Sequence, residues 1–326
     1  MYAWGPTDPT KWKKPGSYKY DDARKPYLDK LASDASKLGP RTYVNRSEPD
    51  MGLVNTAGKT ITSDSKNPII IGIDITGSMS KWPFEIFDRM PLLFQGLAQY
   101  EDREDLEMCI AAIGDATCDN YPLQVNDFAK GIELDTKVNA LFPEGRGGGH
   151  ISESYELFAY FMLEHCKTPN ATSPFLLIYG DEMFYENVNP KQVGHYIGDK
   201  LNRPIESRQV WQKLLQNFNL YLLHKPYGDE NEPDVDEEVK TQWAKAIGKQ
   251  RIIEVPSMDR AVDIAYGLIA KHWGEYRDFK KSMDARGHDA TVKGAVDYSL
   301  RFIDPNKSLK SVVTNATLKL DLDEEA

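Results

Sequence analysis

Several features that would direct a protein to a membrane or to nucleic acid are missing from this 326-residue sequence. No apolar run approaches the roughly 20 residues of a membrane-spanning helix. The opening segment, MYAWGPTDPTKWKKPG, has no apolar core of about 7 to 15 residues, as a secretory signal would. Acidic residues outnumber basic ones by 50 to 40, so generic nucleic-acid binding is not expected. The three cysteines (Cys109, Cys118 and Cys166) lack metal-ligand spacing, and an odd number of thiols is typical of a reducing compartment. We therefore expect a cytoplasmic protein without membrane association.

Common catalytic and ion-binding motifs are also missing. The sequence has no G-x-S-x-G nucleophile elbow. The glycine-rich run Gly145–Gly149 lacks the GK[ST] ending of a phosphate loop, and it follows a predicted helix rather than a strand. The acidic segment Tyr227–Glu238 lacks the central glycine and the spacing of a helix–loop–helix calcium site, which favours a solvated loop. We predict that the protein is not an enzyme.

The most informative stretch that is present is Asn67–Ser80, NPIIIGIDITGSMS. Ile69–Ile73 has the length and β-branched content of a strand buried on both faces. The run ends at Asp74, and Thr76 and Ser78 follow two and four residues later. Three hard oxygen ligands therefore share one turn at the carboxyl edge of a sheet, which suits a small divalent cation.

Strand and helix patterns alternate over residues 67–273. This alternation predicts an α/β fold with a doubly wound, mainly parallel, six-stranded sheet that helices cover on both faces. After the first strand, the others are expected at Leu106–Ile113, Tyr121–Val125, Pro174–Tyr179, Asn219–His224 and Arg251–Val255. The second of these alternates like the returning strand of a hairpin, so we predict that it lies at an edge.

Two helices and the chain ends carry further predictions. One helix is expected after Ser80, and Pro91 inside its apolar stripe should kink or restart it. Another should begin at Ser152 as its N-cap. We predict an N-terminal extension over residues 1–66 that packs on the core, a core domain over 67–274, and a C-terminal extension over 275–326. A partner-binding tail is the alternative for the first segment. The last should hold a short helix and strands at Ser299–Ile303 and Thr317–Leu320.

The pentapeptide Asp74-Ile75-Thr76-Gly77-Ser78 resembles the DxSxS/DxTxS element of von Willebrand factor A (vWA) domains. That element is the first part of their metal-ion-dependent adhesion site (MIDAS). The resemblance implies a Rossmann-like sheet and an acidic ligand after the fourth strand, where Asp181 stands. It also implies that the first and fourth strands are neighbours at the topological switch point, so Asp74 and Asp181 should meet. The implied cofactor is Mg²⁺ or Mn²⁺.

The second loop of the site departs from the family. Most members have a threonine after paired glycines, whereas this chain has His150, Ile151 and Ser152. The sequence GGGHISES resembles the GGG-acidic-x-PED variant of intracellular vWA domains attached to alpha-kinases, in which the position of His150 is acidic. Three alternatives stay open: Ser152 reaches the metal, His150 acts through water, or the loop contributes nothing. Asp115 resembles an acidic residue of the same variant, and we place it at the rim.

The resemblance implies a binding module that engages a carboxylate of a protein partner through the cation. Cytosolic relatives of this kind often serve as adaptors for AAA+ ATPases or as scaffolds in larger assemblies. Two alternatives stay open. One is a magnesium-dependent phosphohydrolase or ATPase, because GIDITGS faintly resembles the phosphate loop of actin/hexokinase-type ATPases, although glycine precedes threonine there. The other is a structural subunit of a viral or phage particle, which the terminal extensions would suit.

Overall fold

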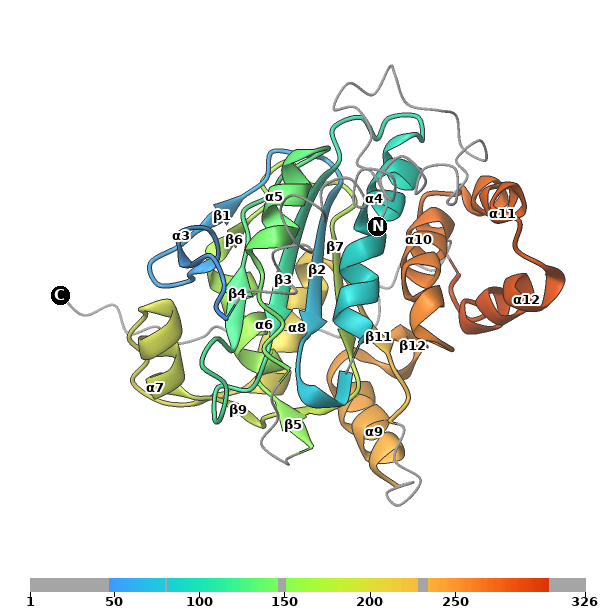
Figure 1. Ribbon diagram of the computed structural model, residues 1–326. Coiled ribbons are helices and arrows are strands. Elements are labelled where there is room, and N and C mark those ends of the chain that lie inside the picture. Colours follow the sequence, from blue (N-terminus) through green and yellow to red (C-terminus); the bar gives the residue numbers. More distant parts are fainter. Residues whose placement is uncertain (1–46, 80, 146–150, 228–233, 305–326) are drawn as a thin grey trace.

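The computed structural model describes residues 47–79, 81–145, 151–227 and 234–304, and its centre is a six-stranded sheet (Figure 1). The strand order is β12-β11-β7-β2-β3-β4. The strands are β2 (Pro68–Asp74), β3 (Glu107–Ile113), β4 (Leu123–Val125), β7 (Phe175–Gly180), β11 (Asn219–His224) and β12 (Ile252–Glu254). Neighbours are parallel except β3 and β4, which are antiparallel. The α/β class and the mainly parallel sheet are confirmed, with one antiparallel strand at an edge.

Strand β2 pairs along its length with β3 and β7. Ile71 lies opposite Ile110 of β3 and Leu177 of β7. All seven residues of β2 are buried. Because successive side chains of a strand point to opposite faces, Ile71 joins the apolar cluster on one face and Ile70 joins the cluster on the other. This double burial explains the unbroken apolar run in the sequence.

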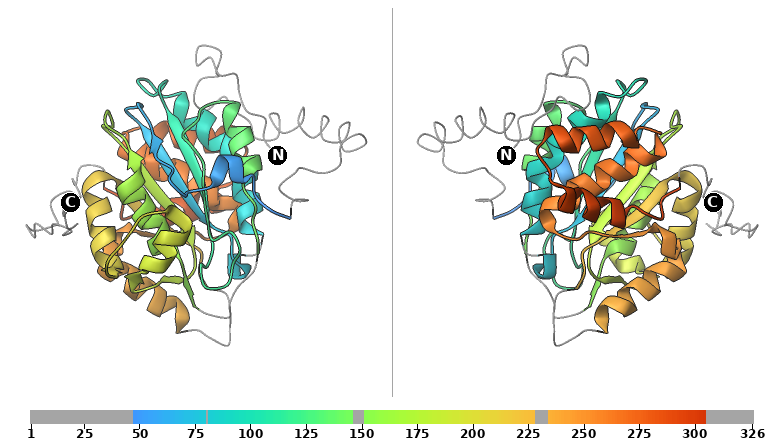
Figure 2. Two further views of the ribbon diagram at one scale, coloured as in Figure 1. Left: turned by 90° about the vertical axis from the view of Figure 1, so that its left-hand side faces the viewer. Right: turned by 90° about the vertical axis from the view of Figure 1, so that its right-hand side faces the viewer.

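Helices cover both faces of the sheet (Figures 1 and 2). Those that contribute to the first apolar cluster are α4 (Trp82–Ala98), α5 (Glu133–Ala140) and α10 (Ala261–His272). Those that contribute to the second are α6 (Tyr155–His165), α8 (Ser207–Asn217) and α9 (Val235–Ile247). None of the described helices combines the length and the apolar character that crossing a bilayer requires.

Short elements complete the described chain. They are α3 (Met51–Val54), β1 (Ile61–Thr62) paired with β6 (Cys166–Lys167), β5 (Ser152–Glu153) paired with β8 (Met183–Phe184), β9 (Asn187–Val188) paired with β10 (Ile205–Glu206), α7 (Pro190–Gln192), and the single turns η2 (Gly77–Met79), η3 (Val193–Ile197), η4 (Lys249–Arg251) and η5 (Met258–Arg260). Val54 and Ile61 are buried in the two apolar clusters, so residues 47–66 pack on the sheet domain.

Two helix predictions differ from the structure. Of the two alternatives at Pro91, the restart is wrong, because α4 continues through it, and the kink stays a prediction. Met90 and Leu92 on either side are buried, and their packing offsets the hydrogen bond that proline cannot make. The expected N-cap at Ser152 is also wrong, because that residue lies in β5 and α6 begins at Tyr155. Its pairing with β8 is a long-range contact that the local pattern does not reveal.

The C-terminal part of the described chain is helical. Helices α11 (Tyr276–Ala285) and α12 (Ala290–Ser299), with the residue directly after α12, place four buried side chains in the cluster that contains α4 and α10: Phe279, Met283, Val296 and Leu300. Figure 2 shows these two helices in orange and red on the outer side of the molecule. The strand expected at Ser299–Ile303 is wrong, since α12 ends in a turn there. The strand expected at Thr317–Leu320 lies outside the described residues.

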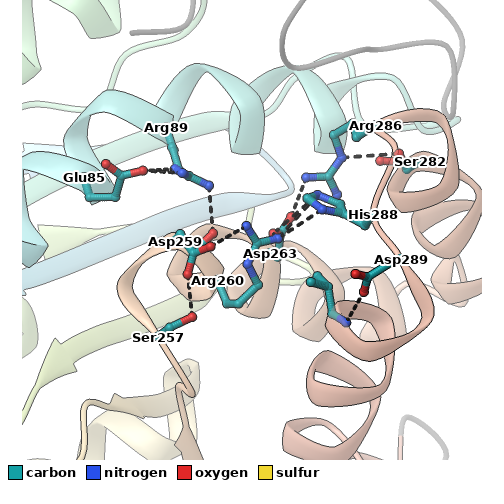
Figure 3. A network of polar contacts seen from close by, with 11 residues as sticks. Glu85, Arg89, Ser257, Asp259, Arg260, Asp263, Ser282, Arg286, His288 and Asp289 are labelled. Atoms are coloured by element: carbon teal, nitrogen blue, oxygen red, sulfur yellow. Dashed lines mark hydrogen bonds and ion pairs between the residues drawn. The ribbon is translucent and has the colours of Figure 1, made fainter.

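A buried ion-pair network joins α11 to α10 (Figure 3). Asp263 of α10 accepts hydrogen bonds from Arg260 and Arg286, the latter directly after α11. The side chains of Asp263 and Arg286 are each 1% exposed. Two helices that are separate in the sequence are thereby fixed by charge as well as by apolar contact.

His272 closes α10 against the sheet. Its ring lies 5.3 Å from that of Phe175, and its Nε2 lies 2.8 Å from the hydroxyl of Tyr221. Burial, with a smaller contribution from Arg251, lowers the pKa of His272 to about 4. The folded protein therefore holds a neutral ring at pH values where the unfolded chain, with a pKa of about 6.5, takes up a proton.

We expect this difference to make folding stability fall as pH falls from about 6.5 to about 4. Between pH 7 and pH 5 the loss that His272 causes should be about 2 kcal/mol. Urea unfolding of the wild type and of His272→Gln at both pH values checks this, since the other titrating groups are shared. The variant should lose correspondingly less stability on acidification. Equal losses in the two proteins would contradict the assignment.

Candidate metal centre

The carboxyl ends of β2 and β7 lie side by side, at the edge of the sheet where the sequence predicts the metal site (Figure 1). The two strands are parallel neighbours, with Ile73 opposite Tyr179. Since β3 lies on the other side of β2, the strand order reverses here, which is the usual place for a ligand in an open α/β sheet. Asp74 ends β2 and Asp181 follows β7, and both are fully buried.

The turn after β2 is built by Asp74 and Thr76. Oδ1 of Asp74 accepts hydrogen bonds from the backbone N–H of Thr76 at 2.8 Å and from its hydroxyl at 2.6 Å. An aspartate that bonds the backbone two residues on is a common local turn. Ser78 follows in η2, and its Oγ lies 3.4 Å from Oγ1 of Thr76. The spacing of these residues therefore arranges their oxygens locally.

Ser78 connects this turn to the other strand. Its hydroxyl donates to Oδ1 of Asp181 at 2.9 Å. Four of the six predicted ligands, Asp74, Thr76, Ser78 and Asp181, thus form one continuous set of oxygen atoms. Two carboxylates and two hydroxyls are the hard ligands that Mg²⁺ and Mn²⁺ prefer.

The described part of the second loop has no hydrogen bond to this set. His150 lies outside the described residues. Ser152 is half-buried in β5, and none of the hydrogen bonds within the described chain connects its side chain to Asp74 or Asp181. Its role as a ligand stays a prediction.

Asp115 forms a separate turn after β3. Its carboxylate accepts hydrogen bonds from the backbone and hydroxyl of Thr117, at 2.9 and 2.6 Å, and lies 3.1 Å from the hydroxyl of Tyr185. Asp115 also raises the pKa of Glu153, as a minor contribution behind burial, Asp74 and Glu182. It therefore lies near the acidic cluster, but its carboxylate is hydrogen-bonded by Thr117 and Tyr185.

Two acidic residues of the site were missed by sequence reasoning. Glu153 and Glu182 are 2% and 4% exposed, and the charge of Glu182 contributes to raising the pKa of Glu153, behind burial and Asp74. One oxygen of each carboxyl group, Oε2, is buried without a hydrogen-bond partner in the described part of the chain. For Glu182 the signal was its place directly after Asp181.

Burial and mutual repulsion raise the pKa of three of these carboxyl groups. Burial, followed by the charge of Asp181, raises the pKa of Asp74 and that of Glu182. Burial, followed by the charge of Asp74, raises the pKa of Glu153. Each shift reflects the cost of burying a carboxylate beside another carboxylate. A bound cation would remove that cost, so the cluster favours a positively charged ligand.

Among the described residues, no three His, Cys, Asp or Glu side chains are already arranged around one point as metal ligands. Of the predicted ligands, the described residues include only two of these types, Asp74 and Asp181, because His150 lies outside them; the other described ligands are hydroxyls. The unpartnered oxygens of Glu153 and Glu182 lie beside this set and are acceptors without donors. The oxygen-rich chemistry of these residues fits a hard divalent cation.

Tyr155, the first residue of α6, holds Asp74 in place. Its hydroxyl donates to Oδ2 of Asp74, and its ring packs 5.5 Å from that of Trp243. Gly180 makes room for it, because a Cβ at that position would lie 2.2 Å from the tyrosine hydroxyl. The last residue of β7 must therefore be small for this support to form.

Gly180→Ala is expected to destabilise the fold by about 1 to 3 kcal/mol, because the added methyl group displaces Tyr155 from Asp74. Urea unfolding measures the change. Gly294→Ala is the matched control, since nothing lies within 4 Å of a Cβ there and alanine favours the helix. A cost at Gly180 no larger than that at Gly294 would show that Tyr155 is not held in this position.

Neither a protein-family model nor a curated protein sequence matches the chain. Among solved structures, proximal thread matrix protein 1 of the mussel byssus aligns with 69% of the chain at 11% identity and a TM-score of 0.42, over 49% of its own length. A second structure of that mussel protein, described as having a zinc-occupied MIDAS motif, aligns with 64% of the chain at 12% identity and a TM-score of 0.41, over 48% of its length. The pilus adhesin SpaC of Lactobacillus rhamnosus GG aligns with 71% at 11% identity and a TM-score of 0.43, over 31% of its length. The chain thus spans about half of the mussel protein and a third of the adhesin. TM-scores this low do not identify a shared fold, so the α/β assignment rests on the order and direction of the strands.

Proposed function

We propose that this chain is a vWA-like binding module that holds a carboxylate of a protein partner through a divalent cation, Mg²⁺ or Mn²⁺. The single observation that supports the proposal most is the connected set of oxygens at the switch point. It runs from Asp74 through Thr76 and Ser78 to Asp181, with a 2.9 Å hydrogen bond between the two loops. These four residues would hold the cation, and the cation would supply the positive charge that attracts the partner's carboxylate.

The electrostatics of the cluster support a cation rather than a neutral ligand. Burial and neighbouring carboxylates raise the pKa of Asp74, Glu153 and Glu182. A protein that buries several carboxyl groups together loses stability unless a counter-charge is present. The proposal therefore gives a reason for an arrangement that is otherwise unfavourable.

We propose a binding role rather than a catalytic one, and a role as an adaptor or scaffold in a larger assembly, for example with an AAA+ ATPase. The hydroxyls of Thr76 and Ser78 donate their protons to the carboxylates of Asp74 and Asp181. Their oxygen lone pairs can therefore act as ligands of a cation. Turnover of ATP and of a phosphomonoester with Mg²⁺ tests the catalytic alternative. Turnover that disappears in Asp74→Ala would favour that alternative.

The binding role itself is tested with two peptide pools that differ only in Asp and Glu against Asn and Gln. The acidic pool should be retained by the immobilised protein in Mg²⁺ or Mn²⁺ and released by EDTA. The amide pool should not be retained under either condition. Retention of the acidic pool in EDTA, or equal retention of both pools, would contradict a cation-mediated contact with a carboxylate.

A further inference from the structure

Lys225 places an ammonium group directly on the candidate metal centre. Its Nζ lies 2.5 Å from Oδ2 of Asp181. The carboxylate is fully buried and the lysine side chain is 15% exposed. With Ser78 donating to Oδ1, both oxygens of Asp181 have a donor in this arrangement.

The backbone of Lys225 is fixed although its side chain is long. Its N–H donates to the carbonyl of Gly180 at 3.0 Å, which continues the pairing of β11 with β7. The preceding residue, His224, pairs with Asp236 of α9 at 2.7 Å. The ammonium stands on a flexible four-carbon stem, so it can leave Asp181 while the main chain stays in the sheet.

A divalent cation and this ammonium compete for the same carboxylate. A magnesium ion binds oxygen at about 2.0 to 2.1 Å. An ion held by Asp181 would therefore lie within a few ångströms of Nζ, where two positive charges repel strongly in a buried site. Lys225 would have to withdraw from Asp181 before the ion can bind.

We propose that Lys225 is a built-in counter-cation that neutralises Asp181 when no metal ion is bound, and that a divalent cation must displace it. This inference rests on the proposed function and adds a regulatory element to it. The lysine lowers the apparent affinity of the centre for the cation. It also couples occupancy of the centre to exposure of an ammonium group at the edge of the sheet.

Removing the ammonium should tighten cation binding. A hydrogen bond between charged groups contributes roughly a tenfold to a hundredfold factor in an equilibrium constant. We therefore expect Lys225→Met to bind Mn²⁺ and Mg²⁺ about ten to a hundred times more tightly than the wild type, by calorimetric titration at constant ionic strength. Lys59→Met is the control, because Lys59 is also buried (14% exposed) but lies beside Asp127. Its affinity should equal that of the wild type.

The outcomes separate this inference from the proposed function. If the wild type binds the cation and Lys225→Met binds it with equal or lower affinity, the competition is overturned and the proposed function stays intact. An equal gain in Lys59→Met would overturn it as well, because the effect would then be one of net charge. Binding by Lys225→Met alone would support the competition and contradict cation use by the wild type. No binding by any of the proteins would overturn both.

A second measurement uses the wild-type protein and does not depend on how the variant folds. An amine-acylating reagent followed by mass spectrometry reports the reactivity of each lysine. Lys225 should be protected in EDTA and become several-fold more reactive in saturating Mn²⁺, whereas Lys59 should not change. Equal reactivity of Lys225 in the two conditions would overturn the proposed displacement.

Discussion

Replacing Asp74 with alanine is expected to abolish divalent-cation binding while leaving the fold intact. Asp74 is the only carboxylate in the turn after β2, and Thr76 is oriented by it at 2.6 Å. A hard cation at this position depends on charged oxygen ligands, so the loss should be complete within the range of a calorimetric titration. Far-UV circular dichroism should remain native, because the side chain lies at the end of its strand.

The buried charge of Asp74 also leads to an expectation about folding stability. Burial and Asp181 raise the pKa of Asp74, so the carboxylate is unfavourable in the absence of a cation. In EDTA, Asp74→Asn should be as stable as the wild type or more stable by about 1 kcal/mol, since the amide keeps the shape and removes the charge. A cation at a hundred times its dissociation constant should stabilise the wild type by about 2.7 kcal/mol and the variant not at all. Urea unfolding with and without Mn²⁺ measures both effects.

Asp115→Asn is the matched control for this experiment. It removes an equally buried carboxylate from a neighbouring strand end, but that carboxylate is hydrogen-bonded by Thr117 in its own turn. The control should still bind the cation. Unchanged Mg²⁺ or Mn²⁺ binding in Asp74→Ala would disprove the assignment of the site. Loss of binding in Asp115→Asn would instead indicate that the metal centre lies closer to Asp115, at the rim of the site.

The central part of the site was predictable because its geometry is local or follows from sheet topology. The turn from Asp74 to Ser78 is held by contacts between residues two positions apart. The meeting of Asp74 with Asp181 follows from two strands that lie side by side at a switch point. The turn follows from the local sequence, whereas the neighbouring positions of these two strands were implied by the resemblance to vWA domains.

The rest depends on contacts between distant segments. Lys225 reaches Asp181 only because β11 lies beside β7, and nothing near Lys225 in the sequence indicates a buried carboxylate. With Ser152 as the expected N-cap, Glu153 would fall in the first turn of a helix, where an acidic residue is favourable. Its pairing in β5 with Phe184 of β8 moved it into the site instead. Long-range strand pairing outweighed local helix propensity, as it often does.

Replacing Asp263 with alanine is expected to cost about 3 to 5 kcal/mol of folding stability, although the residue is far from the metal centre in the chain. Arg260 donates to one of its oxygens at 2.7 Å and Arg286 donates to the other (Figure 3). Without the carboxylate, the guanidinium of Arg286, whose side chain is 1% exposed, loses the counter-charge that Asp263 supplies. An uncompensated buried charge is among the most destabilising changes in a protein. Urea unfolding at pH 7 measures the loss.

A double variant separates charge from packing at this network. Asp263→Ala with Arg286→Met removes both partners, so it should be more stable than Asp263→Ala alone. Acid gives an independent test. Burial opposes the charge of Asp263, but Arg286 and Arg260 outweigh it and hold its pKa below the ordinary value. The stabilisation is thus present above pH 4 or so and is lost as pH falls through the folded pKa. If the double variant were no more stable than the single one, α11 would be held to α10 by apolar contacts such as that between Phe279 and Tyr266, and the ion pairs would contribute little.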